Sequence, residues 1–246
     1  MLSSAIATFG LITNSAAVII GAMLIAPFLS PIMGIAFAIL GGRRRLLLRA
    51  TITLAAGIVG ALALSYAFAW LALQLPFGAL TTVPAEVTSR TRPGPFDLAI
   101  ALAGGAAAAY ALVRLEGAAA LFGVAIATAL MPPLCSIGIG LALGDQGIWS
   151  GAGILFATNI VAIVASATVV FKALHLRPRR SGAGSSPLVL AAALVAATTF
   201  VLVPSAISLA QQNQATVLSA QFADSLSSTV AAVLTERLPG SRLVDV

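Results

Sequence analysis

The sequence GAMLIAPFLSP, residues 21–31, lies inside an apolar run that extends from residue 16 to residue 40. A run of this length is typical of a membrane-spanning helix, which needs about 20 apolar residues. Pro27 and Pro31 each lack a backbone N–H and clash with the preceding helical turn, which disfavours a continuous helix. The stretch therefore predicts a membrane helix that is broken near its middle.

The composition of the whole chain places its other segments in the same environment. Of 246 residues, 60% are hydrophobic and 8% are charged, and the mean hydropathy is +1.08. Water-soluble domains carry far more charge, so we expect an all-α integral membrane protein in contact with the lipid bilayer. Apolar segments recur along the whole chain, which does not fit a single cleaved signal peptide. About seven membrane segments are predicted, at residues 1–13, 15–41, 50–74, 96–113, 117–143, 149–173 and 187–210.

The broken segment has a second copy later in the chain. At an offset of 102 residues, Gly21 aligns with Gly123 and Pro31 with Pro133. We therefore predict two repeats, each with a proline-broken helix. The predicted parts are a first membrane repeat at 1–74, a polar extracytoplasmic loop at 75–95, a second membrane repeat at 96–176, an extra C-terminal span at 187–210 and an amphipathic tail at 211–246.

The basic residues predict how the repeats are oriented. Each repeat has three segments, so the second copy is inverted if the broken segments cross the membrane. The basic loops 43–49 and 172–180 and Arg114 then share one face, which holds nine of the 13 basic residues. The positive-inside rule makes this face cytoplasmic, and we expect a multi-pass protein of the inner (plasma) membrane. Broken segments that returned to their own side would instead put the two basic loops on opposite faces.

The two proline breaks form the predicted substrate site. Irregular backbone at membrane depth is tolerated where it is buried in protein or lines a polar cavity, and paired broken helices are typical of transporters. We expect a transporter or channel-like permease for a small polar or anionic solute. The alternative is a non-transporting membrane scaffold or sensor, in which the prolines only shape packing. The candidate substrate-binding residues are Asn14, Pro27, Ser30, Pro31, Thr128, Pro132, Pro133, Ser136 and Asn159.

A second group of polar residues is predicted to act in gating or coupling. Residues 86–97 form the densest polar cluster in the chain and could fold back over the mouth of the site, although a solvated loop is the alternative. Glu116 could instead pair with Arg114 at the level of the lipid headgroups, and Asn159 could simply bond a neighbouring helix. The candidate gating or coupling residues are Glu86, Arg90, Thr91, Asp97 and Glu116.

Other classes of function lack their usual residues. One cysteine and one histidine do not make a metal site or a catalytic triad, so we expect no enzyme, no metal and no cofactor. The arginines cluster beside apolar spans, which favours a role in membrane topology over nucleic-acid binding. Spans rich in alanine and glycine allow close helix contact, and we expect a homo-oligomer.

Three separated motifs resemble one known family. They are GAMLIAP at 21–27 with Pro31, EVTSRTRP at 86–93 followed by DLAIALAGGA at 97–106, and GVAIATALMPPL at 123–134. Together they resemble the prokaryotic hydrophobic membrane family called domain of unknown function 389, from about Ile6 to Lys172. The resemblance implies a multi-span inner-membrane protein, preceded in many members by a soluble N-terminal region, and it supplies no chemistry.

Overall fold

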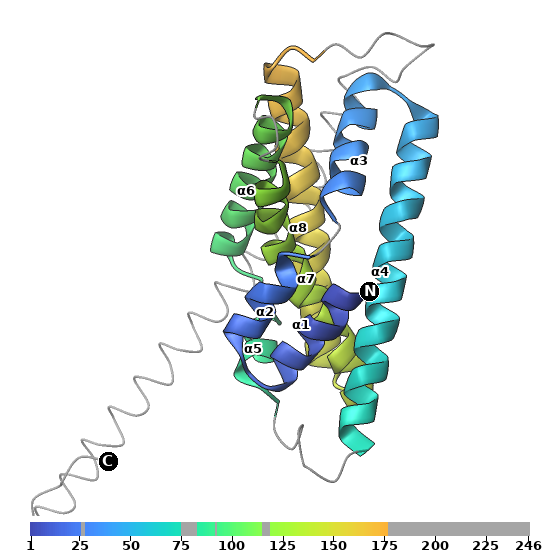
Figure 1. Ribbon diagram of the computed structural model, residues 1–246, viewed down its shortest axis with the longest axis vertical. Coiled ribbons are helices and arrows are strands. Elements are labelled where there is room, and N and C mark those ends of the chain that lie inside the picture. Colours follow the sequence, from blue (N-terminus) through green and yellow to red (C-terminus); the bar gives the residue numbers. More distant parts are fainter. Residues whose placement is uncertain (26–27, 75–82, 92, 115–118, 177–246) are drawn as a thin grey trace, which may run out of the picture. The chain divides into compact units, whose positions relative to one another are not determined.

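The computed structural model of the chain describes residues 1–25, 28–74, 83–91, 93–114 and 119–176, without the side chains of residues 119–125. These described residues all fall within one compact unit, and they form helices and no strand (Figure 1). The helices are α1 (Leu2–Ile12), α2 (Ala16–Met23), α3 (Leu29–Gly41), α4 (Arg44–Gln74), α5 (Ala85–Thr88), α6 (Pro95–Arg114), α7 (Ala119–Leu143) and α8 (Gln146–Ala173).

Four of the described helices, α4, α6, α7 and α8, are long and apolar enough to cross a membrane. The predicted all-α membrane class is therefore confirmed, while α1 and α3 are shorter apolar helices. The predicted segments at 96–113 and 149–173 match α6 and α8 to within three residues. The predicted segments at 187–210 and 211–246 lie outside the described residues.

Two glycines set sharp turns between successive helices. Gly42 follows α3 with φ +61°, and Gly144 follows α7 with φ +70°. This left-handed conformation ends a helix and is easiest for glycine, because glycine has no Cβ to clash. After the second turn, the Asp145 side chain accepts a hydrogen bond from the N–H of Ile148 and caps α8. Each long helix, α4 and α8, can therefore start directly beside the helix that precedes it.

The break predicted in the first repeat is confirmed, because α2 and α3 are separate helices. This broken segment runs beside α4. The hydroxyl of Ser3 donates to the carbonyl of Ala22 at 2.6 Å, so α1 and α2 form an antiparallel hairpin. The rings of Phe9 and Phe68 lie 5.0 Å apart, which places α1 beside the second half of α4. On the first half of α4, a Cβ at Gly34 of α3 would lie 3.3 Å from that of Ala50.

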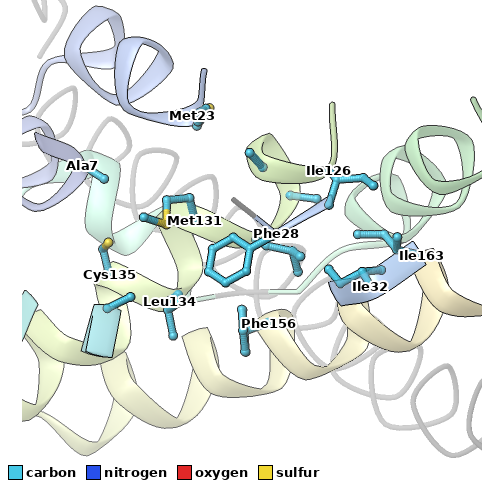
Figure 2. Packing of buried hydrophobic residues seen from close by; sticks show 14 of the residues in the cluster. Ala7, Met23, Phe28, Ile32, Ile126, Met131, Leu134, Cys135, Phe156 and Ile163 are labelled. Carbon is cyan, nitrogen blue, oxygen red and sulfur yellow. The ribbon is translucent and has the colours of Figure 1, made fainter. Parts of the chain in front are cut away.

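The interruption between α2 and α3 lies close to the middle of α4. A Cβ at Gly57, near the centre of α4, would lie 3.8 Å from the ring of Phe28 at the start of α3. Figure 2 shows Phe28 in the buried cluster that also contains Met131, Leu134 and Phe156. The residue just before α3 thus belongs to the packed interior, while Pro27 lies outside the described residues.

The second proline segment differs from its prediction. Pro132 and Pro133 lie inside α7, which is one continuous helix from Ala119 to Leu143. The predicted break in the second repeat is therefore wrong. This helix is also the most enclosed of the four long ones: 72% of residues 126–143 are buried, against 22% of the most apolar stretch of α4. The α7 helix is the centre of the bundle, and α4 lies at its outside.

Candidate functional site

A side chain from α8 explains why α7 continues through its prolines. Because Pro133 has no N–H, the carbonyl of Ala129, four residues earlier, lacks its usual helical donor. The side-chain amide of Asn159 supplies one, with Nδ2 2.8 Å from the Ala129 oxygen. An unsatisfied carbonyl inside a membrane protein is costly, so this hydrogen bond lowers the cost of the proline. Asn159 therefore does bond a neighbouring helix, at the backbone position that the proline leaves open.

Two buried polar atoms, one on α7 and one on α8, have no hydrogen-bond partner within the described part of the chain. They are Ser136 Oγ and Asn159 Oδ1, on side chains of residues that are 0% and 3% exposed. Buried polar groups in native proteins are almost always satisfied, so an orphaned atom calls for an explanation such as a water or an ion. Both residues were singled out from the sequence as candidates for substrate binding.

Ser136 lies on the side of α7 that faces α8. Ala129 and Ser136 are seven residues apart, which is close to two helical turns, so they share one side of the helix. Gly140 continues the same side, where its Cβ would lie 2.7 Å from the backbone nitrogen of Trp149. The orphaned hydroxyl of Ser136 therefore sits between the contact at Asn159 and the tight contact at Trp149, along one α7–α8 interface.

The candidates of the first repeat are placed differently. Pro31 is buried in α3, but Ser30 is exposed, so its hydroxyl does not join Ser136 in the interior. Thr128 is half-buried on α7. Asn14 lies at the exposed turn between α1 and α2. The structure thus brings Asn159 of α8 to the proline pair of α7 through the Ala129 carbonyl, and it buries Ser136 on α7.

Sequence reasoning missed a second buried polar group between α1, α4 and α7. The hydroxyl of Thr8 lies 2.9 Å from Ser65 Oγ and 2.7 Å from the carbonyl oxygen of Ser4, and Ser65 Oγ donates to the carbonyl of Cys135 at 2.8 Å. Ser4, Thr8 and Ser65 are all fully buried. The spacing of Ser4 and Thr8, one helical turn apart in an apolar segment, is the sequence signal that could have revealed it.

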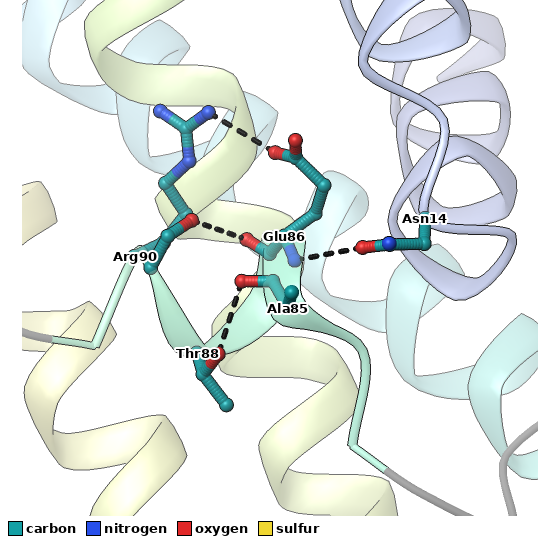
Figure 3. A network of polar contacts seen from close by, with 6 residues as sticks. Asn14, Ala85, Glu86, Thr88 and Arg90 are labelled. Carbon is teal, nitrogen blue, oxygen red and sulfur yellow. Dashed lines mark hydrogen bonds and ion pairs between the residues drawn. The ribbon is translucent and has the colours of Figure 1, made fainter. Parts of the chain in front are cut away.

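Two of the candidate gating residues, Glu86 and Arg90, form a small polar network with Asn14 at the α1–α2 turn (Figure 3). The N–H of Glu86 donates to Asn14 Oδ1 at 3.0 Å, and Glu86 Oε2 forms an ion pair with Arg90 at 3.3 Å. Arg90 Nε is buried without a partner in the described residues, although the side chain is 32% exposed. Because the pair is partly exposed, its contribution to stability is small.

The residues that follow attach this segment to the second half of the chain. A Cβ at Gly151, on α8, would run into the carbonyl oxygen of Thr91, so the backbones meet directly. Asp97 Oδ2 accepts the N–H of Gly94 at 2.9 Å at the start of α6. Residues 84–91 therefore fold back and touch both the first helix pair and α8. Glu116 lies outside the described residues.

Replacing Asn14 separates two roles of this turn. Asn14 has φ +54°, so Asn14→Gly keeps the backbone conformation and loses only the bond to Glu86. We expect hydrogen–deuterium exchange in residues 84–91 to become faster in Asn14→Gly, with global stability changed by less than about 1 kcal/mol. Asn14→Ala should give the same local effect and a further loss from backbone strain. Unchanged exchange in Asn14→Gly would contradict a role for this bond in holding the segment.

Metal binding by acidic, cysteine and histidine side chains has no support in the described residues. No group of three or more such side chains occurs there. The single cysteine, Cys135, is buried and free. The chemistry of the α7–α8 interface therefore rests on neutral oxygens and an amide.

Apolar helices of spanning length, packed around a central proline-containing helix, define an all-helical membrane protein. The chain matches the family described as domain of unknown function (DUF389) over residues 23–165, more than half of its length. It belongs to this family. It is also similar to an uncharacterised protein of Methanocaldococcus jannaschii, with 32% identity over 181 residues, which cover 73% of this chain and 54% of the relative. The chain thus spans about half the length of the curated relative that it matches, and no solved structure gives a significant match.

Proposed function

We propose that this protein is a membrane transporter or channel-like permease for a small polar solute. The observation that carries the proposal is the pair of orphaned polar atoms, Ser136 Oγ and Asn159 Oδ1, buried beside the proline pair of the central helix. Polar atoms without partners inside a membrane bundle are costly, and by default they indicate a site of function. The proposal gives the chain no enzymatic activity and no cofactor.

The helix boundaries support two repeats. At the offset of 102 residues, the end of α1 at Ile12 corresponds to the end of α6 at Arg114, and the start of α4 corresponds to that of α8. The left-handed glycines Gly42 and Gly144 correspond as well. The packing is reciprocal, since α4 packs on α7 while α8 packs on α3. These matches favour a repeated architecture in which α2 and α3 together are the counterpart of α7.

The direction of the helices supports inversion of the repeats. Phe37, close to the end of α3, packs edge-on against Phe171, close to the end of α8, with ring centroids 6.1 Å apart. Since α4 starts directly after α3, α8 ends near the point where α4 begins. The two equivalent helices thus run in opposite directions, as inverted repeats require. We propose that the shared end, with the basic loops 43–49 and 172–180, faces the cytoplasm of the inner membrane.

Solute flux tests the function directly. The full-length protein would be reconstituted in liposomes and screened for flux of alkali cations, ammonium, small amines and small organic acids. We expect flux of at least one solute, reduced about tenfold or more in Asn159→Ala, because the substitution removes both the orphaned acceptor and the donor to Ala129. The matched control is Ser166→Ala on the same helix, where a hydroxyl bonded to the Ile163 carbonyl is lost. Equal flux in protein-free liposomes and in liposomes that contain the protein, for every solute, would reject the proposal.

The apolar packing around Phe28 favours the second candidate function, a non-transporting scaffold or sensor. Phe28 is 4% exposed in a cluster of apolar side chains, so the residue just before α3 packs as part of the core. In this case Pro31→Ala and Pro133→Ala should change thermal stability without changing any solute flux. For either function we propose a homo-oligomer in the membrane, which analytical ultracentrifugation in detergent would detect.

A further inference from the structure

Two contacts show that α6 and α8 run in the same direction. A Cβ at Gly151, near the start of α8, would meet the carbonyl of Thr91, just before the start of α6. Further along both helices, a Cβ at Gly105 of α6 would lie 2.8 Å from Ile163 Cα of α8. Helices that touch near their starts and again further on are parallel. They therefore begin at one end of the bundle and finish at the other.

The acidic residues that the structure describes all lie at the end where α6 and α8 begin. Asp97 is in the first turn of α6, Asp145 caps α8, and Glu86 is in α5, which precedes α6. The end of α3 and the start of α4 lie at the opposite end, because Phe37 of α3 packs against Phe171 close to the end of α8 (Figure 1).

This opposite end is basic and has no counter-charge among the described residues. It carries every described arginine and lysine except Arg90, namely Arg43, Arg44, Arg45, Arg49, Arg114 and Lys172. All of these residues are exposed, and within the described part of the chain the ion pair of Arg90 with Glu86 is the only one. The basic end is therefore free to attract a negatively charged partner.

Arg45 and Arg49 lie on the outer side of α4. The side of α4 that packs on the bundle holds its buried residues, Ala50, Leu54, Ala61, Ser65, Ala69 and Ala72. At about 100° of rotation per residue, Arg45 and Arg49 lie opposite this buried side, together with Ile52 and Val59. Ile52 and Val59 are 58% and 68% exposed. In a membrane, large apolar side chains on the outer side of a bundle contact the acyl chains of lipids.

The other end of the same side sets the depth of the arginines. Tyr66 and Trp70 are exposed on this side of α4, and these residue types prefer the interface between membrane and water. From Arg49 to Trp70 the helix rises by about 30 Å, which is the thickness of the hydrocarbon core. With the aromatic pair at one interface, Arg45 and Arg49 lie at the level of the lipid headgroups in the other leaflet.

The spacing of the two arginines suits one phosphate group. Residues four apart on a helix have Cβ atoms about 5–6 Å apart, so both guanidinium groups of Arg45 and Arg49 can reach the same phosphate. Two like charges at this spacing repel each other, and a bound phosphate would remove this repulsion. A zwitterionic headgroup would bring its own ammonium group to a basic surface, whereas an anionic headgroup brings no positive charge.

We propose that the outer side of α4 binds an anionic phospholipid, with its phosphate at Arg45 and Arg49 and an acyl chain along Ile52 and Val59. A free phosphate ion would leave the exposed apolar side chains beside the arginines uncovered, so the occupant is a lipid. The inference goes beyond the proposed transport function and does not depend on it.

Thermal unfolding of the full-length protein in neutral detergent tests the lipid site. A ligand that binds only the native state raises the melting temperature as its occupancy rises. The added molecules are phosphatidylglycerol, phosphatidylcholine with the same acyl chains, and soluble glycerol phosphate, at equal ionic strength. We expect a saturable increase in Tm with phosphatidylglycerol that exceeds the increase with phosphatidylcholine. Glycerol phosphate, which has no acyl chain, should give no saturable increase.

Two double variants separate the site from the general charge of the basic end. In Arg45→Gln/Arg49→Gln, Tm without lipid should stay the same or rise, because two repelling charges are lost. Its apparent affinity for phosphatidylglycerol should fall about tenfold or more. The control Arg43→Gln/Arg44→Gln removes the same charge, but Arg43 precedes α4 and Arg44 is turned about 100° from Arg45. Its affinity should fall by less than about threefold, since charges without contact are screened by salt.

Three results would overturn the lipid site. They are a Tm increase with phosphatidylglycerol no larger than with phosphatidylcholine, an equal increase with glycerol phosphate, and equal losses of affinity in the two double variants. Equal losses would mean that the basic end attracts anionic lipid only through its overall charge. A preference for phosphatidylglycerol that Arg45→Gln/Arg49→Gln weakens more than the control supports the site, whether or not the protein shows solute flux.

Discussion

Asn159→Leu is expected to destabilise the native chain more than it destabilises a Pro133→Ala background, by about 1–3 kcal/mol. In the native chain, leucine removes the donor to the Ala129 carbonyl, which then stays buried and unsatisfied. In the Pro133→Ala background, the new backbone N–H at position 133 can donate to the same carbonyl, so the amide of Asn159 is no longer required. The measurement is the free energy of unfolding in mixed micelles for the four proteins of the cycle.

The cycle also cancels an unrelated effect. Leucine removes the orphaned Asn159 Oδ1 together with the donor, and relief of that orphan is favourable in both backgrounds. The difference between backgrounds therefore isolates the bond to Ala129. Pro132→Ala is the matched control, because its new N–H would serve the carbonyl of Thr128, four residues before it, and leave Ala129 without a donor. Equal costs of Asn159→Leu in all three backgrounds would show that the amide does not replace the missing backbone donor.

This hydrogen bond also shows where prediction from the sequence ends. The apolar segments follow from hydropathy, so the sequence predicts the ends of α6, α7 and α8 to within three residues. The start of α4 lies six residues before its predicted position. Whether a proline breaks a helix depends on whether another element satisfies the carbonyl that it frees. In α7 the donor comes from Asn159, on the following helix, and no local pattern around Pro133 announces it.

The candidate site was predictable in the same partial way. Ser136 and Asn159 stood out because polar residues are rare in apolar spans, and both are buried with an orphaned atom. Ser30 stood out for the same reason but is exposed, because the start of α3 turns that side of the helix away from the bundle. The bonds of Thr8 with Ser65 join helices far apart in the chain, so only the packed structure reveals them.

Gly138→Ala is expected to lower the free energy of unfolding by about 1–3 kcal/mol, because it overpacks the contact between α4 and α7. A Cβ at this position would lie 2.6 Å from Ser65 Cβ and 2.9 Å from the backbone nitrogen of Tyr66. The backbone of α4 cannot move aside as a flexible side chain would, so the two helices must separate. Separation would also lengthen the 2.8 Å hydrogen bond from Ser65 Oγ to the Cys135 carbonyl.

Gly153→Ala is the control for this substitution. Nothing lies within 4 Å of a Cβ at Gly153 on α8, so this variant gains the higher helix propensity of alanine without a clash. It should therefore be as stable as the native chain or more stable by up to about 1 kcal/mol. Unfolding of both variants in the same mixed micelles compares them directly. If Gly138→Ala were as stable as Gly153→Ala, the result would contradict the close contact of α4 with α7 at Gly138. It would also contradict the central position of α7 in the bundle, which depends on this contact.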